Sequence, residues 1–140
     1  MKNNYHNKQI NNVLSVGCGD AEQDMLIINN LQINNYTMVE PCQEYKSAIE
    51  NNLKEVNKET NILLFLITLE EFCLNINNFE NNHFDLIIMS HVLYYIKDYV
   101  KYVNMLKRYC KNIIIYHQSD KSVFYEIQQS LSELNISSVD

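Results

Sequence analysis

The chain has 140 residues, which fits a single domain that can bury a hydrophobic core without metal or disulfide cross-links. Apolar residues make up 46% and charged residues 20%, which excludes a wholly disordered chain, and two glycines and one proline exclude collagen-like and Pro/Gly-rich proteins. The net charge of −6, with no basic run longer than Lys107-Arg108, argues against binding to nucleic acid or to an anionic membrane surface.

Short apolar runs alternate with segments of helical period along the chain. In order, we predict a polar tail at 1–11, strands at 13–16, 37–39, 62–67, 84–89 and 113–116, and helices between them and at 123–134. Nearly continuous apolar strands are typical of parallel sheets that helices cover on both faces. The expected fold is therefore α/β, a doubly wound, Rossmann-like parallel sheet of about five strands in three α-β-α layers, formed by residues 12–140.

Both glycines lie in one turn, Val16-Gly17-Cys18-Gly19-Asp20, directly after the first predicted strand. Glycine lets the backbone turn tightly and approach a ligand, and the next helix directs its free amides there; the alternative is a plain strand-to-helix turn. A dinucleotide-binding turn has a third glycine where this chain has Glu22, a carboxylate that would repel a diphosphate. S-adenosylmethionine has no phosphate, and its ammonium and sulfonium groups favour acidic surroundings, so it is the preferred ligand.

Two further polar sites follow the second and third predicted strands. Glu40, in Val39-Glu40-Pro41, stands 23 positions after Gly17 and can accept hydrogen bonds from both ribose hydroxyls of an adenosine; a surface loop acid is the alternative. Thr68-Leu69-Glu70-Glu71 can present backbone amides and a hydroxyl to an adenine edge, or can simply begin a short helix.

The fourth predicted strand leads into Ser90-His91-Val92-Leu93-Tyr94-Tyr95. The tyrosines offer aromatic faces to a cation, and His91 can orient or deprotonate an acceptor amine near neutral pH. The alternatives are tyrosines that pack on the sheet and a structural histidine. Asp85, at the start of the strand, is expected to be hydrogen-bonded there and not to act as a catalytic acid.

These blocks resemble the class I S-adenosylmethionine-dependent methyltransferases over residues 12–135, and more narrowly the histamine N-methyltransferase family. The narrower similarity is carried by Leu14-Ser15-Val16-Gly17, Glu22-x-Asp24, Val39-Glu40-Pro41, Phe84-Asp85 and Leu93-Tyr94-Tyr95-x-Lys97-Asp98. The resemblance implies S-adenosylmethionine as cofactor, contacted by Gly17, Cys18, Gly19, Glu40, Thr68, Leu69 and Ser90. It also implies a small-molecule amine as substrate, facing His91, Tyr94 and Tyr95, with His91 as the catalytic residue.

The chain departs from that family in sequence and in length. Asp20-Ala21 stands where the family has Ala-Gly, and Tyr45 and His91 each replace a glutamine, the second of which contacts the amine substrate. The resemblance to class I enzymes implies a seven-stranded sheet, whereas this chain has only five predicted strands. We therefore expect a truncated domain without the last antiparallel pair of strands. The strand at 113–116 is then an exposed edge through which the chain can associate with itself or a partner.

The expected function is methyl transfer to a small-molecule amine by in-line displacement from the sulfonium. The alternative is a truncated, non-catalytic S-adenosylmethionine-binding protein that acts through a partner, and carboxyl or hydroxyl acceptors stay open. The four cysteines form no Cys-x-x-Cys pair or His/Cys cluster, so we expect free thiols, a cytoplasmic location and no metal. No signal peptide or membrane-spanning segment is expected, because the first nine residues are polar and no apolar run approaches 18 residues.

Overall fold

The computed structural model describes residues 9–56, 59–79, 82–90, 92 and 96–116. They form a five-stranded parallel sheet with the strand order β3-β2-β1-β4-β5, which confirms the predicted fold class. The elements are β1 (Ile10–Val16), α1 (Glu22–Asn30), β2 (Ile33–Val39), η2 (Gln43–Tyr45), α2 (Lys46–Leu53), β3 (Asn61–Phe65), α3 (Leu69–Leu74), η3 (Ile76–Asn78), β4 (Phe84–Ser90), α4 (Tyr99–Lys107) and β5 (Cys110–Tyr116).

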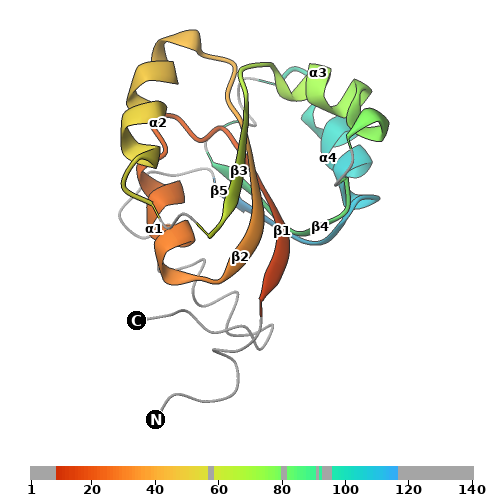
Figure 1. The fold of residues 1–140 in the computed structure, drawn as a ribbon. Coiled ribbons are helices and arrows are strands. Elements are labelled where there is room, and N and C mark those ends of the chain that lie inside the picture. The colour runs from red at the N-terminus through yellow and green to blue at the C-terminus, as the bar shows by residue number, and fades with distance from the viewer. Residues whose placement is uncertain (1–8, 57–58, 80–81, 91, 93–95, 117–140) are drawn as a thin grey trace.

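Helices cover both faces of the sheet, with α1 and α2 on one side and α3 and α4 on the other (Figure 1). Successive side chains of a strand point to opposite faces, and the core is accordingly divided in two. Val13 of β1 packs in the cluster that contains Ile27 of α1 and Ile49 of α2. Its neighbour Leu14 packs in the cluster that contains Leu106 of α4. Strands buried on both faces explain the continuous apolar runs in the sequence.

The direction in which successive strands are added to the sheet reverses after β3. From β1 the chain passes to β2 and β3 on one side, and then returns to place β4 and β5 on the other. Such a reversal leaves a crevice outside the carboxyl ends of the two central strands, which is where open α/β sheets bind ligands. The backbone amide of Gly17 donates to the carbonyl of Val39 at 2.8 Å, so the loop after β1 is fixed against the end of β2.

The first strand begins earlier than predicted. Ile10 and Asn11, expected in the polar tail, are the first residues of β1, and the side chain of Ile10 is buried. The backbone amides of Asn11 and Asn12 both donate to Oδ2 of Asp85, at 2.8 and 3.1 Å. The two asparagines are typical of a loop in sequence, but these contacts hold them in the sheet.

Helical spacing of apolar residues also fails to mark the end of α4. Cys110 falls at helical spacing after Val103 and Leu106, yet α4 ends at Lys107 and Cys110 is the first residue of β5. The amide of Tyr109 donates to the carbonyl of Leu106. This hydrogen bond closes the turn after α4, and β5 begins at the next residue. The helix predicted at 123–134 lies outside the described residues.

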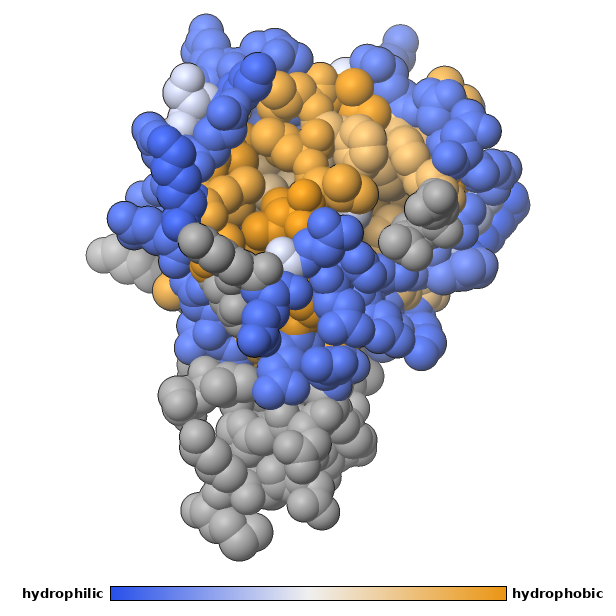
Figure 2. Space-filling model, in the orientation of Figure 1, coloured by the Kyte–Doolittle hydropathy of each residue, from blue (hydrophilic) through white to orange (hydrophobic). Residues whose placement is uncertain are grey.

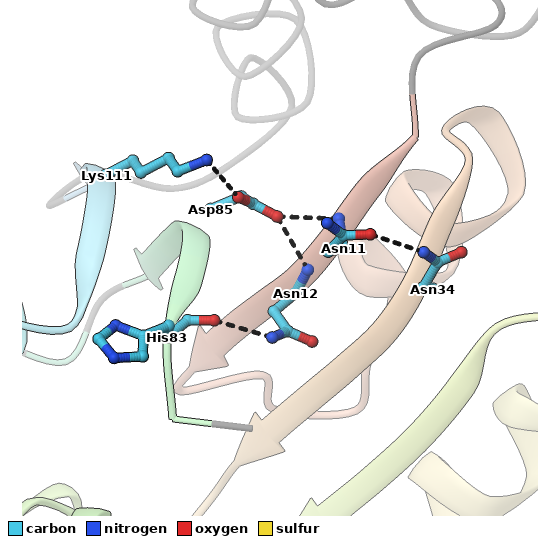
Figure 3. Close-up of polar contacts among 6 residues, drawn as sticks. All are labelled: Asn11, Asn12, Asn34, His83, Asp85 and Lys111. Carbon is cyan, nitrogen blue, oxygen red and sulfur yellow. Dashed lines mark hydrogen bonds and ion pairs between the residues drawn. The ribbon is translucent and has the colours of Figure 1, made fainter. Parts of the chain in front are cut away.

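The amino ends of the strands are joined by polar side chains (Figure 3). Asp85 of β4 accepts from the backbone of β1 and forms an ion pair with Lys111 of β5 at 3.2 Å. The side-chain amide of Asn34 donates to Oδ1 of Asn11, and that of Asn12 donates to the carbonyl of His83. The prediction that Asp85 is hydrogen-bonded at the strand entrance is confirmed, and its place at the amino edge separates it from the crevice.

Apolar residues gather along β3, which is one terminal strand of the described sheet. Leu63 is 46% exposed, and with Phe65, Phe72 and Phe79 it lines a hollow of about 320 Å³. Figure 2 shows this apolar, hollowed surface between α2 and α3. β5 is the other terminal strand of the described sheet, and self-association through it stays a prediction. No helix in the described ranges has the length and apolar character needed to cross a membrane.

Candidate functional site

A cavity of about 680 Å³ opens at the carboxyl ends of β1, β2, β3 and β4. Small-molecule sites typically have volumes of about 300–1,000 Å³, so the cavity has the size of a ligand site. All seven residues that the sequence assigned to cofactor binding line it: Gly17, Cys18, Gly19, Glu40, Thr68, Leu69 and Ser90. These residues are spread over more than 70 positions of the sequence, and the parallel sheet brings them together in one cavity.

The turn after β1 contains three residues in the left-handed region, Gly17 at φ 80°, Gly19 at φ 56° and Ala21 at φ 72°. A Cβ on Gly17 would lie 2.0 Å from Cγ1 of Val92 and 2.8 Å from the carbonyl oxygen of Ser90. A Cβ on Gly19 would meet no atom within 4 Å. Gly17 is therefore required by the close approach of the loop after β4, whereas Gly19 leaves open space at the cavity wall.

Glu40 connects the turn after β1 to the loop after β2. Its carboxylate is buried, with Oε1 accepting from the backbone amide of Gly19 and Oε2 from that of Cys42, each at 2.9 Å. A carboxylate offers about four lone-pair positions, so each oxygen keeps one for a further donor. The two strongest sequence signals, the glycine turn and the strand-end acid, are in direct contact.

A buried polar group beneath the turn escaped the sequence assignment. Asp24, in the first turn of α1, is only 3% exposed, lines the cavity and accepts hydrogen bonds from the hydroxyls of Tyr36 and Ser15. Burial raises the pKa of Asp24 above its ordinary value. Ile27 and Ile28 follow Asp24 by three and four positions, and this helical spacing is the signal that could have placed Asp24 on the buried face.

Thr68 and Leu69 stand where the chain leaves β3 and begins α3. The Thr68 hydroxyl oxygen accepts from the backbone amide of Glu71 at 3.1 Å, which caps the helix. The sequence Thr-x-x-Glu is the pattern of a capping box, so the alternative that this segment begins a short helix is confirmed. Leu69 is buried at the cavity wall and offers it an apolar surface.

Cys18 lies in the glycine turn as a half-buried thiol. Burial raises the pKa of Cys18 far above its usual range, and the carboxylates of Asp24 and Glu40 raise it further. The residue is therefore a protonated thiol in the cavity wall rather than a nucleophilic thiolate.

The charged side chains among the described lining residues are all acidic: Asp24, Glu40 and Glu70. An acidic, partly apolar cavity suits a ligand with positive charge and disfavours a diphosphate. Within the described ranges no cluster of His, Cys, Asp and Glu is arranged to hold a metal ion. The predicted substrate residues His91, Tyr94 and Tyr95 lie outside the described residues.

Comparison with known proteins decides the family. A family model described as a methyltransferase domain matches residues 3–133. The chain belongs to the methyltransferase domain family. This match confirms the expected class I methyltransferase domain and does not distinguish the histamine N-methyltransferases within that class. No curated protein matches the chain by sequence.

Solved structures show the same methyltransferase fold. Precorrin 8w decarboxylase from Methanobacterium thermoautotrophicum is similar with a TM-score of 0.60 and 16% identity, over 88% of this chain and 62% of that one. An S-adenosylmethionine-dependent methyltransferase from Clostridium acetobutylicum is similar with a TM-score of 0.57 and 20% identity, over 79% and 44%. The plantazolicin methyltransferase BpumL, in complex with a triazolic desmethylPZN analogue and S-adenosylhomocysteine, has a TM-score of 0.55 and 14% identity, over 91% and 55%.

The matched part is shorter than these methyltransferase-fold proteins. The matches span between 44% and 62% of the length of the three solved structures. At 14% to 20% identity they establish the fold, and the chemistry of this methyltransferase domain has to be argued from its own residues.

Proposed function

We propose that this methyltransferase domain binds S-adenosylmethionine in the cavity at the carboxyl edge and transfers its methyl group to a small-molecule amine. The observation that carries the proposal is the contact between Glu40 and Gly19, 2.9 Å long, in a cavity whose described charged residues are all acidic. The contact joins the two elements that adenosine-binding folds use, and the acidic lining favours a sulfonium and an ammonium over a diphosphate.

The proposed binding roles follow the order of the strands. Glu40 accepts from the ribose hydroxyls through its remaining lone pairs, and Thr68 and Leu69 flank the adenine. Gly17, Cys18, Gly19 and Ser90 surround the methionine end. When bound, S-adenosylmethionine supplies a methyl group on a positively charged sulfur. The protein then has to hold the acceptor in line with that group and exclude water, and such positioning can contribute about 7–11 kcal/mol to lowering a barrier.

The acceptor side of the proposal rests on the sequence. His91, Tyr94 and Tyr95 lie in the chain between Ser90 and Ile96, both of which line the cavity. We assign the tyrosines to the acceptor cation, and His91 to orienting the amine and removing its proton as the catalytic residue. The similarity of Leu93-Tyr94-Tyr95-x-Lys97-Asp98 to histamine N-methyltransferases supports a small-molecule amine as the acceptor.

Calorimetric titration with S-adenosylmethionine and S-adenosylhomocysteine tests the first step, with NAD⁺ as the control ligand. We expect both sulfur compounds to bind and NAD⁺ not to bind, because it brings a diphosphate to an acidic cavity. The absence of heat at millimolar S-adenosylmethionine would overturn the proposal. A transfer assay with labelled cofactor and a panel of amines, carboxylic acids and alcohols then tests the second step. Binding without transfer to any acceptor would instead assign a non-catalytic cofactor-binding function.

The Glu40→Ala variant tests the ribose contact. Two hydrogen bonds to a charged acceptor are lost, so affinity for S-adenosylhomocysteine should fall at least about tenfold. Glu44→Gln, on the exposed 3-10 turn η2, removes a nearby charge outside the cavity lining and is the matched control. Equal affinities of wild type and Glu40→Ala would show that another group holds the ribose.

A further inference from the structure

We propose that the chain forms a homodimer through β3, which pairs in antiparallel orientation with β3 of a second copy about a two-fold axis at Leu63. β3 is a terminal strand of the described sheet and is hydrogen-bonded to β2 on one side. Its residues do not line the cavity at the carboxyl edge, so the dimer does not depend on the proposed function.

The outer edge of β3 lacks the features by which proteins ordinarily prevent strands from pairing between molecules. Such edges are protected by lysine, proline, bulges or a covering segment. The strand Asn61–Phe65 contains no charged residue and no proline, and its register with β2 is continuous from end to end. Leu63, at its centre, is 46% exposed. The strand is therefore suited to pairing with another strand.

The directions of the backbone groups select the register of the pair. The carbonyl of Phe65 accepts from the amide of Glu40, directly after β2, so the backbone groups of Phe65 point toward β2. Backbone groups alternate along a strand, so those of Leu63 also point inward, and those of Ile62 and Leu64 point to the outer edge. With the axis at Leu63, Ile62 of each copy lies opposite Leu64 of the other and exchanges backbone hydrogen bonds with it. This register pairs all five residues of β3.

The side chains are complementary in the same register. Leu63 of one copy lies opposite Leu63 of the other in a pair without mutual backbone hydrogen bonds, where Cα atoms are only about 4.5 Å apart. The most exposed apolar side chain of the strand is thus covered by its own copy. Ile62 and Leu64, both half-buried, meet on the opposite face of the sheet, and apolar cross-strand pairs stabilise a sheet.

A second copy of the chain fits this surface in charge. Each copy has a net charge of −6, so two copies repel each other unless they meet where neither has to bury a charge. The hollow beside Leu63, in the apolar surface between α2 and α3 (Figure 2), is lined by neutral residues: Asn35, Thr37, Asn61, Leu63, Phe65, Phe72, Asn78, Phe79 and Phe84. Five paired residues extend about 17 Å, which is short for a permanent interface, so we expect reversible association.

β5, the other terminal strand of the described sheet, is less suited to this pairing. It contains Lys111, whose side chain is exposed and forms an ion pair with Asp85 of β4. A lysine on an edge strand opposes pairing with a second molecule. Association through β5 is the alternative from which variants of β3 distinguish the proposed dimer.

Sedimentation equilibrium of the full chain from about 10 µM to about 1 mM tests the dimer, and we expect reversible dimerisation in this range. Leu63→Lys should raise the dissociation constant at least about tenfold, because like charges would face each other across the axis. Leu26→Lys is the matched control, since Leu26 lies on α1 and is 45% exposed, and its association should equal that of wild type. Monomeric wild type at every concentration, or equal dissociation constants for wild type and Leu63→Lys, would overturn the proposal.

Cysteine cross-linking tests the register and decides the matter if Leu63→Lys does not fold. With diamide as oxidant and wild type as the background for the four native cysteines, Leu63→Cys should form a disulfide-linked dimer. Asn61→Cys is the control, because its two copies would lie four residues apart along the strands, about 14 Å, and a disulfide spans Cα atoms up to about 7 Å apart. Equal cross-linking of the two variants, or none in either, would overturn the proposed pairing.

Discussion

The two glycines of the turn after β1 meet different physical demands at the scale of single residues. Gly17→Ala would combine a φ of 80° with a Cβ placed 2.0 Å from a Val92 methyl group. Gly19→Ala would meet only the strain of φ 56°. We expect Gly17→Ala to cost at least about 4 kcal/mol of unfolding free energy and Gly19→Ala about 1–2 kcal/mol, both measured by urea unfolding. Similar losses at the two positions would contradict the packing of the turn against the loop after β4.

The charge of Asp24 gives stability a defined pH dependence. Burial raises its pKa above the ordinary 3.8, so the folded protein keeps a proton that the unfolded chain releases. Folded-state stability therefore falls as the pH rises from 3.8 through the folded-state pKa, and Asp24→Asn removes this loss. We expect the stability difference between Asp24→Asn and wild type to grow over that window and then level off in urea unfolding at a series of pH values.

Burial outweighs the hydrogen bonds from Ser15 and Tyr36, which lower the pKa of Asp24. Burial also raises the pKa values of Tyr36 and Cys18, so both stay neutral over this window. The charge of Asp20 opposes ionisation of Asp24. Ser15 contributes a hydroxyl that does not titrate. A stability difference that is constant from pH 3.8 upward would contradict a raised pKa.

Among the elements, α3 depends on a single side chain at its start. Thr68 accepts from the amide of Glu71, and its hydroxyl also lies 3.3 Å from the Glu71 carboxylate. Thr68→Ala should lower the unfolding free energy by about 1 kcal/mol, because the loss of a helix cap leaves the amide without its partner. Thr68→Ser keeps the hydroxyl and should restore most of the loss in thermal unfolding. A destabilised serine variant would mean that the threonine methyl group, rather than the cap, is what matters.

Element boundaries were the least predictable part of the fold. The interior of each strand follows from its apolar run, because both of its faces are buried. The start of β1 does not, because Asn11 and Asn12 are held by Asp85, which lies more than 70 positions away. The start of β5 at Cys110 depends on where α4 closes, and periodicity alone does not mark that point.

At the scale of the whole molecule, most of the candidate site was predictable because the sheet is parallel. Residues that follow parallel strands lie at one edge, so Gly17, Glu40 and Thr68 could be brought together without knowing any contact. The partner of Asp24 could not be predicted in this way. Tyr36 reaches it from the neighbouring strand, and that pairing depends on the register of β1 and β2 and on the placement of α1 over them.

Ligand binding should stabilise the molecule as a unit. A ligand that binds only the folded state adds about 2.7 kcal/mol at 100 times its dissociation constant. We expect saturating S-adenosylhomocysteine to raise the melting temperature in a thermal-shift assay, and the Glu40→Ala variant to show a smaller rise at the same concentration. Equal shifts in the two proteins would place the ligand away from the strand ends.

The asparagines at the amino ends of the strands give the two halves of the sheet different sensitivities to solution conditions. Asn61 donates to Asn35, Asn35 donates to the backbone of Asn11, and Asn34 donates to the side chain of Asn11, which joins β3, β2 and β1 without a charged group. Screening by added salt weakens attraction between exposed ions but has little effect on neutral amides. Raised ionic strength should therefore weaken the exposed ion pair between Lys111 of β5 and Asp85 of β4, while the amide contacts keep β3, β2 and β1 aligned.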